Sequence, residues 1–222
     1  MQKIAGDLPK SLIPIEKKPF LHYQLTWLGR QGISDVVMCT GYGADQIERY
    51  AKDGRAWGLT LRYVNEGDRQ LGTGGALRLA LDKGCLQAEF AVIYGDSFLP
   101  IDFSPLWAYF QSRKEPALMV VLKNDGRWDK SNVNFDGQKV TRYDKRQGDP
   151  GMRFIDYGLN FLRSAVVQKE FPAQGAYDLA DCFHTLSERG DLAGYEVKNR
   201  FYEIGSPQGL KDFSEYLSTS PI

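Results

Sequence analysis

Strand-like and helix-like hydrophobic patterns alternate along the first half of the chain, and this alternation limits the possible folds more than any other feature. Strand patterns occur at 35–39, 59–63, 90–94 and 117–122. Helical spacing of apolar residues occurs at 19–29, 44–52, 76–81 and 104–110. Because strands separated by helices form βαβ units, we predict an α/β fold with a Rossmann-like, mixed and mainly parallel sheet flanked by helices.

The second half is richer in strand patterns. Val133 to Val140, with Asp136-Gly137 at its centre, predicts a β-hairpin, and 154–161 predicts a further strand. Two amphipathic helices are expected after this strand, the last beginning at Ser206-Pro207. We therefore predict one domain over 1–222, with a nucleotide-binding half up to about residue 125 and a β-rich substrate half from about 126.

Charge and composition exclude several classes of protein. Lys plus Arg and Asp plus Glu both number 28, so the chain has no global attraction to nucleic acid or an anionic membrane. The three cysteines (Cys39, Cys85 and Cys182) and two histidines share no metal-ligand spacing, which indicates a reducing compartment without a zinc site or disulfide framework. The sequence shows neither a membrane-length apolar run nor a signal peptide, so we expect a cytoplasmic protein.

A glycine-rich segment at 71–77 lies between a predicted strand and a predicted helix. Gly72 and Gly74 flank Thr73 there; glycines let backbone N–H groups approach a ligand, and a helix N-terminus favours anions. A flexible turn without a ligand is an equal alternative. The chain has no Gly-x-Gly-x-x-Gly after a first strand, which argues against a Rossmann-type oxidoreductase.

Two carboxylates follow predicted strands, at the edge where α/β sheets collect ligands. Asp96 ends the strand at 90–94, and Glu203 precedes the cap of the last helix. Either carboxylate can hold Mg²⁺ on triphosphate oxygens. The alternatives are a turn cap for Asp96 and an ordinary strand-to-helix junction for Glu203.

Four other polar residues are candidates for ligand contacts. Lys10, which lies between two prolines, and Lys145, which follows the predicted hairpin, can each pair with a phosphate. Glu66 can accept hydrogen bonds from guanine N1–H and N2–H, and Asn160 can bond sugar hydroxyls. The alternative for Lys10, Lys145 and Glu66 is a charge exposed to solvent. The alternative for Asn160 is an ordinary polar position on a strand.

Five short motifs occur in an order that is more specific than any of them alone. They are Asp-Leu-Pro-Lys-Ser-Leu-Ile-Pro-Ile at 7–15, Lys-Pro-Phe-Leu at 18–21, Leu-Gly-Thr-Gly-Gly-Ala at 71–76, Gly-Asp at 95–96 and Glu-Ile-Gly-Ser-Pro at 203–207. In this order the chain resembles the sugar-1-phosphate nucleotidyltransferases, a family that includes thymidylyltransferases for glucose 1-phosphate and guanylyltransferases for mannose and heptose 1-phosphates. The resemblance covers almost the whole chain.

The resemblance implies transfer of a nucleoside monophosphate from a nucleoside triphosphate to a sugar 1-phosphate, with Mg²⁺ as cofactor and pyrophosphate as the second product. It implies catalytic roles for Lys10, Asp96 and Lys145, metal binding by Asp96 and Glu203, and base and ribose contacts from Gly72, Thr73 and Gly74. It implies sugar binding by Asn132, Asp144, Gly158 and Asn160. Many family members have Asp at the position of Glu203. Glu66 and the motif pattern favour GTP and a mannose- or heptose-type sugar.

The sequence departs from the family pattern at its start. Family members begin with a strand and a Gly-rich loop containing Gly-Thr-Arg, and Met1 falls beyond this loop. A late gene start, a truncated chain and a degenerate relative are three competing explanations, of which we favour the first. The competing function is a non-catalytic relative that binds sugar phosphate or nucleotide. Apolar strand surface left uncovered would favour association into homo-oligomers.

Overall fold

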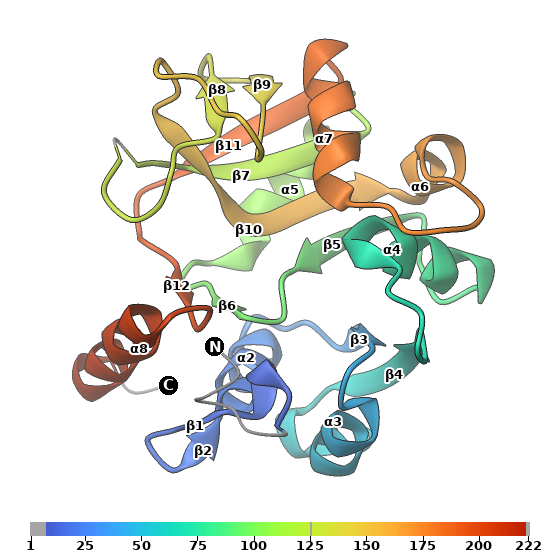
Figure 1. Ribbon diagram of the computed structural model, residues 1–222, viewed down its shortest axis with the longest axis vertical. Helices are drawn as coiled ribbons and strands as arrows, with labels where there is room; N and C mark the ends of the chain where they lie inside the picture. The colour runs from blue at the N-terminus through green and yellow to red at the C-terminus, as the bar shows by residue number, and fades with distance from the viewer. Residues whose placement is uncertain (1–7, 125, 221–222) are drawn as a thin grey trace. The chain divides into compact units, whose positions relative to one another are not determined.

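The computed structural model describes residues 8–124 and 126–220 (Figure 1). The chain forms two compact units, each assembled from separated stretches of sequence. The first unit comprises Met1–Arg69, Tyr94–Phe98 and Phe201–Ile222, and the second comprises Gln70–Ile93 and Leu99–Arg200. The expectation of one domain with a division near residue 125 stays a prediction. Among the described residues, no helix is both long and apolar enough to cross a membrane.

Within its described residues, the first unit contains three short strand pairs and three α-helices. Its elements are η1 (Lys10–Leu12), β1 (Pro14–Ile15), β2 (Lys18–Pro19), α2 (Phe20–Arg30), β3 (Asp35–Thr40), α3 (Ala44–Ala51), η2 (Arg55–Trp57), β4 (Thr60–Asn65), β6 (Ser97–Phe98), β12 (Tyr202–Glu203) and α8 (Pro207–Thr219). β3 and β4 are parallel, whereas β1–β2 and β6–β12 are antiparallel. The helix predicted after Pro19 is confirmed: α2 begins at the next residue, and the chain leaves it through Gly32 at a φ of 73°.

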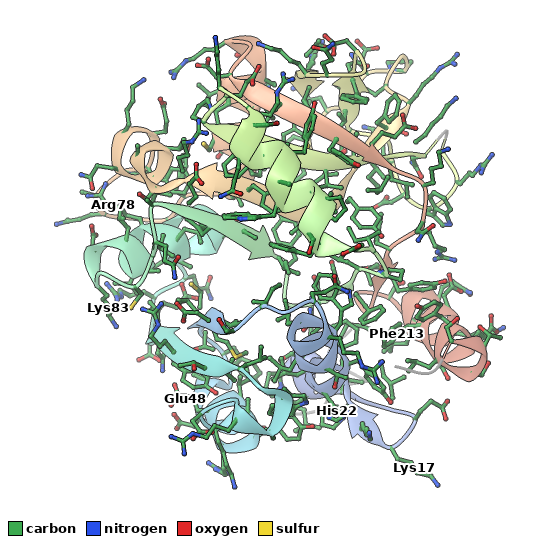
Figure 2. All side chains as sticks on the ribbon, turned by 180° about the vertical axis from the view of Figure 1, so that it is seen from behind. Lys17, His22, Glu48, Arg78, Lys83 and Phe213 are labelled. Atoms are coloured by element: carbon green, nitrogen blue, oxygen red, sulfur yellow. The ribbon has the colours of Figure 1, made fainter. Side chains whose placement is uncertain are left out.

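An aromatic cluster forms the core of the first unit. Phe213 of α8, labelled in Figure 2, is fully buried. Its ring centroid lies 5.3 Å from that of Phe20, 5.6 Å from that of Tyr23 and 5.0 Å from that of Phe98. These contacts hold α8 against α2 and β6, because offset and edge-to-face aromatic pairs add to the free energy of burial.

The second unit is a mixed sheet with helices on its faces. Its elements are α4 (Gly72–Asp82), β5 (Glu89–Ile93), α5 (Phe103–Ser112), β7 (Ala117–Lys123), β8 (Val133–Phe135), β9 (Val140–Tyr143), β10 (Phe154–Arg163), α6 (Ser164–Glu170), α7 (Leu179–Glu188) and β11 (Leu192–Val197). The strand order is β11-β7-β10-β8-β9, with β5 also paired to β10. β11 runs parallel to β7, and β10 runs antiparallel to β5, β7 and β8. The predicted mixed α/β fold and the β8–β9 hairpin are confirmed. The expectation of a mainly parallel sheet is wrong for this unit, because β10 pairs antiparallel with β5, β7 and β8.

β7 shows why the central strands are continuously apolar. Every residue from Ala117 to Leu122 is at most 2% exposed. Met119 contributes to a core cluster that includes Phe183 of α7. The neighbouring Leu118 pairs with Phe161 of β10, whose ring stacks on that of Phe110 in α5. Because both faces of this strand are covered, its sequence is an unbroken apolar run, as expected for a strand buried on both sides.

Two helices begin earlier than their apolar spacing predicts. α5, predicted over 104–110, begins at Phe103, and its N-cap is Asp102, whose carboxylate accepts the amide hydrogen of Ser104. The segment predicted to be a glycine-rich loop is the first turn of α4, which begins at Gly72.

Candidate active site

The two predicted metal carboxylates lie on paired backbone segments of the first unit. Asp96 directly precedes β6, and Glu203 ends β12. Glu203 is the antiparallel partner of Ser97, and the amide of Ile204 donates to the carbonyl oxygen of Asp96 at 3.0 Å. The backbone pairing therefore brings together two acidic residues that are far apart in the sequence.

The carboxylate of Glu203 also has local hydrogen-bond partners. Its Oε2 accepts from the amide of Gly205 at 3.1 Å, and its Oε1 accepts from the hydroxyl of Ser206 at 3.2 Å. Ser206 caps α8 by accepting the amide hydrogen of Gly209 at 3.0 Å. A negative charge at this helix N-terminus is favourable. Both interpretations of Glu203, metal ligand and junction residue, are thus compatible with its position.

This donor set fits a magnesium ion that is partly ligated by substrate. The described residues contain no cluster of three or more His, Cys, Asp or Glu side chains able to hold a metal by themselves. Mg²⁺ is commonly held by one or two carboxylates together with substrate phosphates and water. Asp96 and Glu203 supply two carboxylates, so the residues present match that pattern.

Lys10 begins a short 3₁₀ helix in the first unit. The preceding Pro9 is buried and packs against Gly43, where a Cβ would lie 2.7 Å from the Cγ of Pro9. The carbonyl oxygen of Lys10 accepts the amide hydrogen of Ile13 at 3.1 Å, and the residue is exposed. The backbone at Lys10 is therefore fixed by packing while its side chain faces solvent.

Glu66 lies at the end of the β3–β4 sheet. Its amide donates to the carbonyl oxygen of Thr40 at 2.9 Å. Its carboxylate lies over Gly41, where a Cβ would be 2.5 Å from Oε1. The predicted base-reading carboxylate is thus held at the carboxyl end of two parallel strands, the edge at which ligands bind in α/β sheets.

In the second unit, the amides at Gly74 and Gly75 are not available to a ligand. Both donate to the carbonyl oxygen of Tyr177, at 2.8 and 3.1 Å. Gly72 has a φ of 71°, and a Cβ there would lie 2.8 Å from the same oxygen. These glycines thus allow α4 to approach the segment before α7. The amide of Gly74 is already occupied, and the nucleotide-binding roles of Gly72, Thr73 and Gly74 stay predictions.

Thr73 and Lys145 are brought together by Asp178, a residue that we did not identify from the sequence. The hydroxyl of Thr73 donates to Oδ1 of Asp178 at 2.9 Å, and Nζ of Lys145 lies 3.6 Å from Oδ2. Asp178 is also the N-cap of α7, accepting the amide hydrogen of Ala180 at 3.0 Å. Burial raises the pKa of Asp178, but the hydrogen bonds from Ala180 and Thr73 and the charge of Lys145 outweigh it, so the pKa is lowered overall.

Asp144 shapes the loop that carries Lys145. Its Oδ1 accepts the amide hydrogens of Gln147 at 2.8 Å and Arg146 at 2.9 Å. These hydrogen bonds, led by the one from Gln147, lower the pKa of Asp144 against the effect of desolvation. Its own amide donates to the carbonyl oxygen of Asn132 at 2.9 Å.

Asn132, Gly158 and Asn160 are connected through Asp156, a second residue that we did not single out. The side-chain oxygen of Asn132 accepts the amide hydrogen of Asp156 at 3.0 Å. Oδ1 of Asp156 accepts from the amide of Gly158 at 2.9 Å and from Nδ2 of Asn160 at 3.3 Å, at a bulge in β10. Asn160 is fully buried, and its Oδ1 has no partner among the described residues. A buried acceptor without a donor is costly, so this atom is poised to receive a hydrogen bond.

The predicted sugar-side residues lie in two hydrogen-bonded groups of the second unit. Lys145 pairs with Asp178, which also bonds Thr73. Asn132, Gly158 and Asn160 each bond Asp156, and the amide of Asp144, the residue before Lys145, bonds the carbonyl oxygen of Asn132. The sequence signal for Asp178 was its position before a helix with Leu179, Phe183 and Leu186 on one face. That pattern predicts an N-cap but not its long-range partners.

Carboxylates can share Mg²⁺ with phosphate oxygens, and lysines can pair with phosphate, so the candidate residues suit phosphorylated ligands. Comparison with known proteins gives the family. Residues 3–220 match the family model described as Nucleotidyl transferase, and the chain belongs to this family.

Relatives with described activities cover most of the chain. A D-glycero-alpha-D-manno-heptose 1-phosphate guanylyltransferase from Campylobacter jejuni is 27% identical over 219 residues, covering 96% of this chain and 92% of the relative. A mannose-1-phosphate guanylyltransferase from Mycobacterium tuberculosis is 26% identical over 229 residues, covering 100% of this chain and 63% of the relative.

Solved structures share the fold. HddC from Yersinia pseudotuberculosis, in complex with GMP-PN, has a TM-score of 0.77 at 22% identity, covering 98% of this chain and 93% of that one. The inositol-1-phosphate CTP transferase from T. maritima has a TM-score of 0.80 at 21% identity, covering 98% and 89%. At this identity the likeness supports the nucleotide-diphospho-sugar transferase fold.

Proposed function

We propose that the protein transfers a nucleoside monophosphate from a nucleoside triphosphate to a sugar 1-phosphate, releasing pyrophosphate and forming a nucleotide sugar. The observation that carries this proposal is the similarity, over almost the whole length of both chains, to the Campylobacter guanylyltransferase. The reaction is an in-line attack of a sugar-phosphate oxygen on the α-phosphorus. This oxygen is already ionised, so no general base is needed, and catalysis depends on positioning and charge neutralisation.

On the triphosphate side, we assign roles to residues of the first unit. Asp96 and Glu203 hold Mg²⁺, supported by the backbone pairing that places them together. When bound, the magnesium ion neutralises charge on triphosphate oxygens. Lys10, exposed on a backbone fixed by Pro9, offsets phosphate charge.

On the sugar side, we assign roles to residues of the two hydrogen-bonded groups in the second unit. Lys145 binds the phosphate of the sugar 1-phosphate, and Asn132, Asp144, Gly158 and Asn160 shape the sugar pocket. The buried, unpartnered Oδ1 of Asn160 supports this assignment, because an acceptor of that kind suits a sugar hydroxyl donor. Since Asn160 is fully buried, we expect the sugar to bind with a local opening of the residues around it.

For the nucleotide, we propose GTP and a mannose- or heptose-type sugar. Glu66 supports the base assignment, since a carboxylate can accept both N1–H and N2–H of guanine. Its position over Gly41 at the strand ends is suited to a base lying at that edge. Gly72 and Thr73 contact the nucleotide through the first turn of α4.

The second candidate is a relative that binds sugar phosphate or nucleotide without catalysing transfer. Two observations favour it: the carboxylate of Glu203 is hydrogen-bonded within its own turn, and the amides of Gly74 and Gly75 are occupied by Tyr177. Under this function the protein binds sugar phosphate or nucleotide but does not convert it to product.

Pyrophosphate release with GTP, ATP, CTP, UTP or dTTP and a panel of sugar 1-phosphates separates the two functions. We expect Mg²⁺-dependent release that requires both substrates and is fastest with GTP and a manno-configured sugar 1-phosphate. Folded protein that binds GTP or sugar 1-phosphate by calorimetry but releases no pyrophosphate with any pair would establish the binding function instead.

A further inference from the structure

Three separated segments of the second unit meet at the side chain of Asp178. Its carboxylate accepts from the hydroxyl of Thr73 in the first turn of α4, caps α7 and pairs with Lys145 in the loop after β9. Thr73 lies 105 residues from Asp178 in the sequence. One carboxylate therefore connects the segment assigned to the nucleotide with the lysine assigned to the sugar phosphate.

The hydroxyl of Thr73 makes two hydrogen bonds with the start of α7. While Thr73 donates to Asp178, its hydroxyl oxygen accepts the amide hydrogen of Leu179 at 2.9 Å. The proton of the hydroxyl is committed to the protein, and the hydroxyl helps to cap α7. The side chain of Thr73 thus holds the first turn of α4 against the start of α7.

The contact with Lys145 is looser and more exposed. The side chains of Lys145 and Asp178 are 53% and 42% exposed, and their charged atoms are 3.6 Å apart. A lysine amine on a four-carbon chain gains order from such a partner, although the pair adds little stability. The loop has a second anchor, because Arg146 pairs with Asp181 of α7 at 2.8 Å. Loss of Asp178 should therefore release the amine of Lys145 without unfolding the loop.

From these contacts we propose that Asp178 is a positioning residue that couples the glycine-rich turn to Lys145, so that one side chain sets the orientation of the nucleotide contact and of the sugar-phosphate contact. The proposal rests on the proposed function and deepens it. The two effects are separable because they use different properties of the carboxylate. The turn needs an oxygen acceptor, and Lys145 needs a negative charge.

Substitutions at Asp178 test this separation. Asp178→Asn keeps an oxygen acceptor for Thr73 and removes the charge, so KM for the sugar 1-phosphate should rise about 3-fold while KM for the nucleotide stays near wild type. Asp178→Ala removes both, so KM for the nucleotide should rise as well, by about 5-fold. Thr73→Val removes the hydroxyl and should raise KM for the nucleotide alone. Thr73→Ser keeps the hydroxyl and should leave both KM values near wild type. Equal effects of Asn and Ala on both KM values would overturn the proposal.

Hydrogen exchange of the backbone amides provides a readout that does not need turnover. In Asp178→Ala the amides of 72–76 should exchange faster, and in Asp178→Asn they should match wild type. Asp102→Ala is the matched control, because it removes an N-cap carboxylate from a different helix, α5, of the same unit. Unchanged exchange at 72–76 in Asp178→Ala would contradict the proposal. An inactive wild-type protein would contradict the proposed function, and the exchange data would still decide the role of Asp178.

Discussion

The carbonyl oxygen of Asp96 accepts a hydrogen bond of 3.0 Å from the amide of Ile204, which joins the residue before β6 to the residue that follows Glu203. Asp96→Asn and Glu203→Gln should each keep the shape of the site and remove one charge. We expect turnover to fall on the order of 10²-fold and the Mg²⁺ concentration for half-maximal rate to rise. Steady-state rates over a magnesium titration measure both effects.

The matched control for this charge loss is Glu215→Gln. Glu215 is exposed on α8 and pairs with Lys211 at 3.7 Å. The turnover rate and the magnesium dependence of Glu215→Gln should equal those of wild type. If Asp96→Asn also retains wild-type magnesium dependence, the metal assignment is wrong.

Gly209 allows α8 to approach the strand end that carries Glu203. A Cβ at this position would collide with the carbonyl oxygen of Glu203. Gly209→Ala should therefore displace β12 or the helix and lower the free energy of unfolding by about 1–3 kcal/mol. Urea denaturation measures the loss. Gly151→Ala is the control, because its new Cβ would meet only Oδ1 of Asp149, at an ordinary 3.6 Å; similar losses in the two variants would show that the close approach is not the cause.

Glu115 should make the second unit sensitive to acid. Burial raises its pKa, but hydrogen bonds and charge from Arg113 and Lys139 outweigh it and lower the pKa to about 2. A carboxylate with a depressed pKa contributes stability above its unfolded pKa of about 4.5, and this stability is lost as pH falls toward 2.

Denaturation of wild type and Glu115→Gln between pH 7 and pH 2.5 tests this effect. The difference in unfolding free energy should be roughly 2 kcal/mol at pH 7, allowing for solvent screening, and should shrink below pH 4.5. A difference that does not change with pH would contradict the ion-pair explanation.

Thr40 carries a buried hydroxyl that contacts no hydrogen-bond partner in the described part of the chain. Thr40→Val replaces this hydroxyl by a methyl group of similar shape and should raise the unfolding free energy by about 1 kcal/mol. Thr26→Val is the comparison, because the hydroxyl of Thr26 donates to the carbonyl oxygen of His22 at 2.7 Å and its loss should bring no gain. Calorimetric melting of both variants distinguishes them, and destabilisation by Thr40→Val would indicate that the hydroxyl has a role not seen in the isolated chain.

The sequence predicts those parts of the fold that depend on local chemistry. The last helix begins after Ser206 because a hydroxyl cap and a proline suffice to start it, and β7 is recognisable because both of its faces are buried. The sequence does not predict the start of α4 at Gly72, because glycine has a low helix propensity. In the structure, the hydrogen bonds from Gly74 and Gly75 to Tyr177 override that propensity.

The candidate site is predictable only in part for a similar reason. Asp96 and Glu203 follow from motif order, and their backbone pairing is visible only in three dimensions. The roles of Asp178 and Asp156 depend on partners that are distant in the sequence or on a strand bulge, which local patterns do not encode. Side-chain contacts across a fold arise from topology, so composition and periodicity cannot reveal them.

Transfer of the α-phosphate is the most direct test of the central claim. Protein is incubated with Mg²⁺, a manno-configured sugar 1-phosphate and GTP labelled with ³²P at either the α or the γ position. We predict that α label appears in the nucleotide sugar and γ label appears in pyrophosphate, with both signals lost in Asp96→Ala. Label passing from the γ position to the sugar, or folded protein that leaves both labels in GTP with every sugar 1-phosphate tried, would contradict the claim.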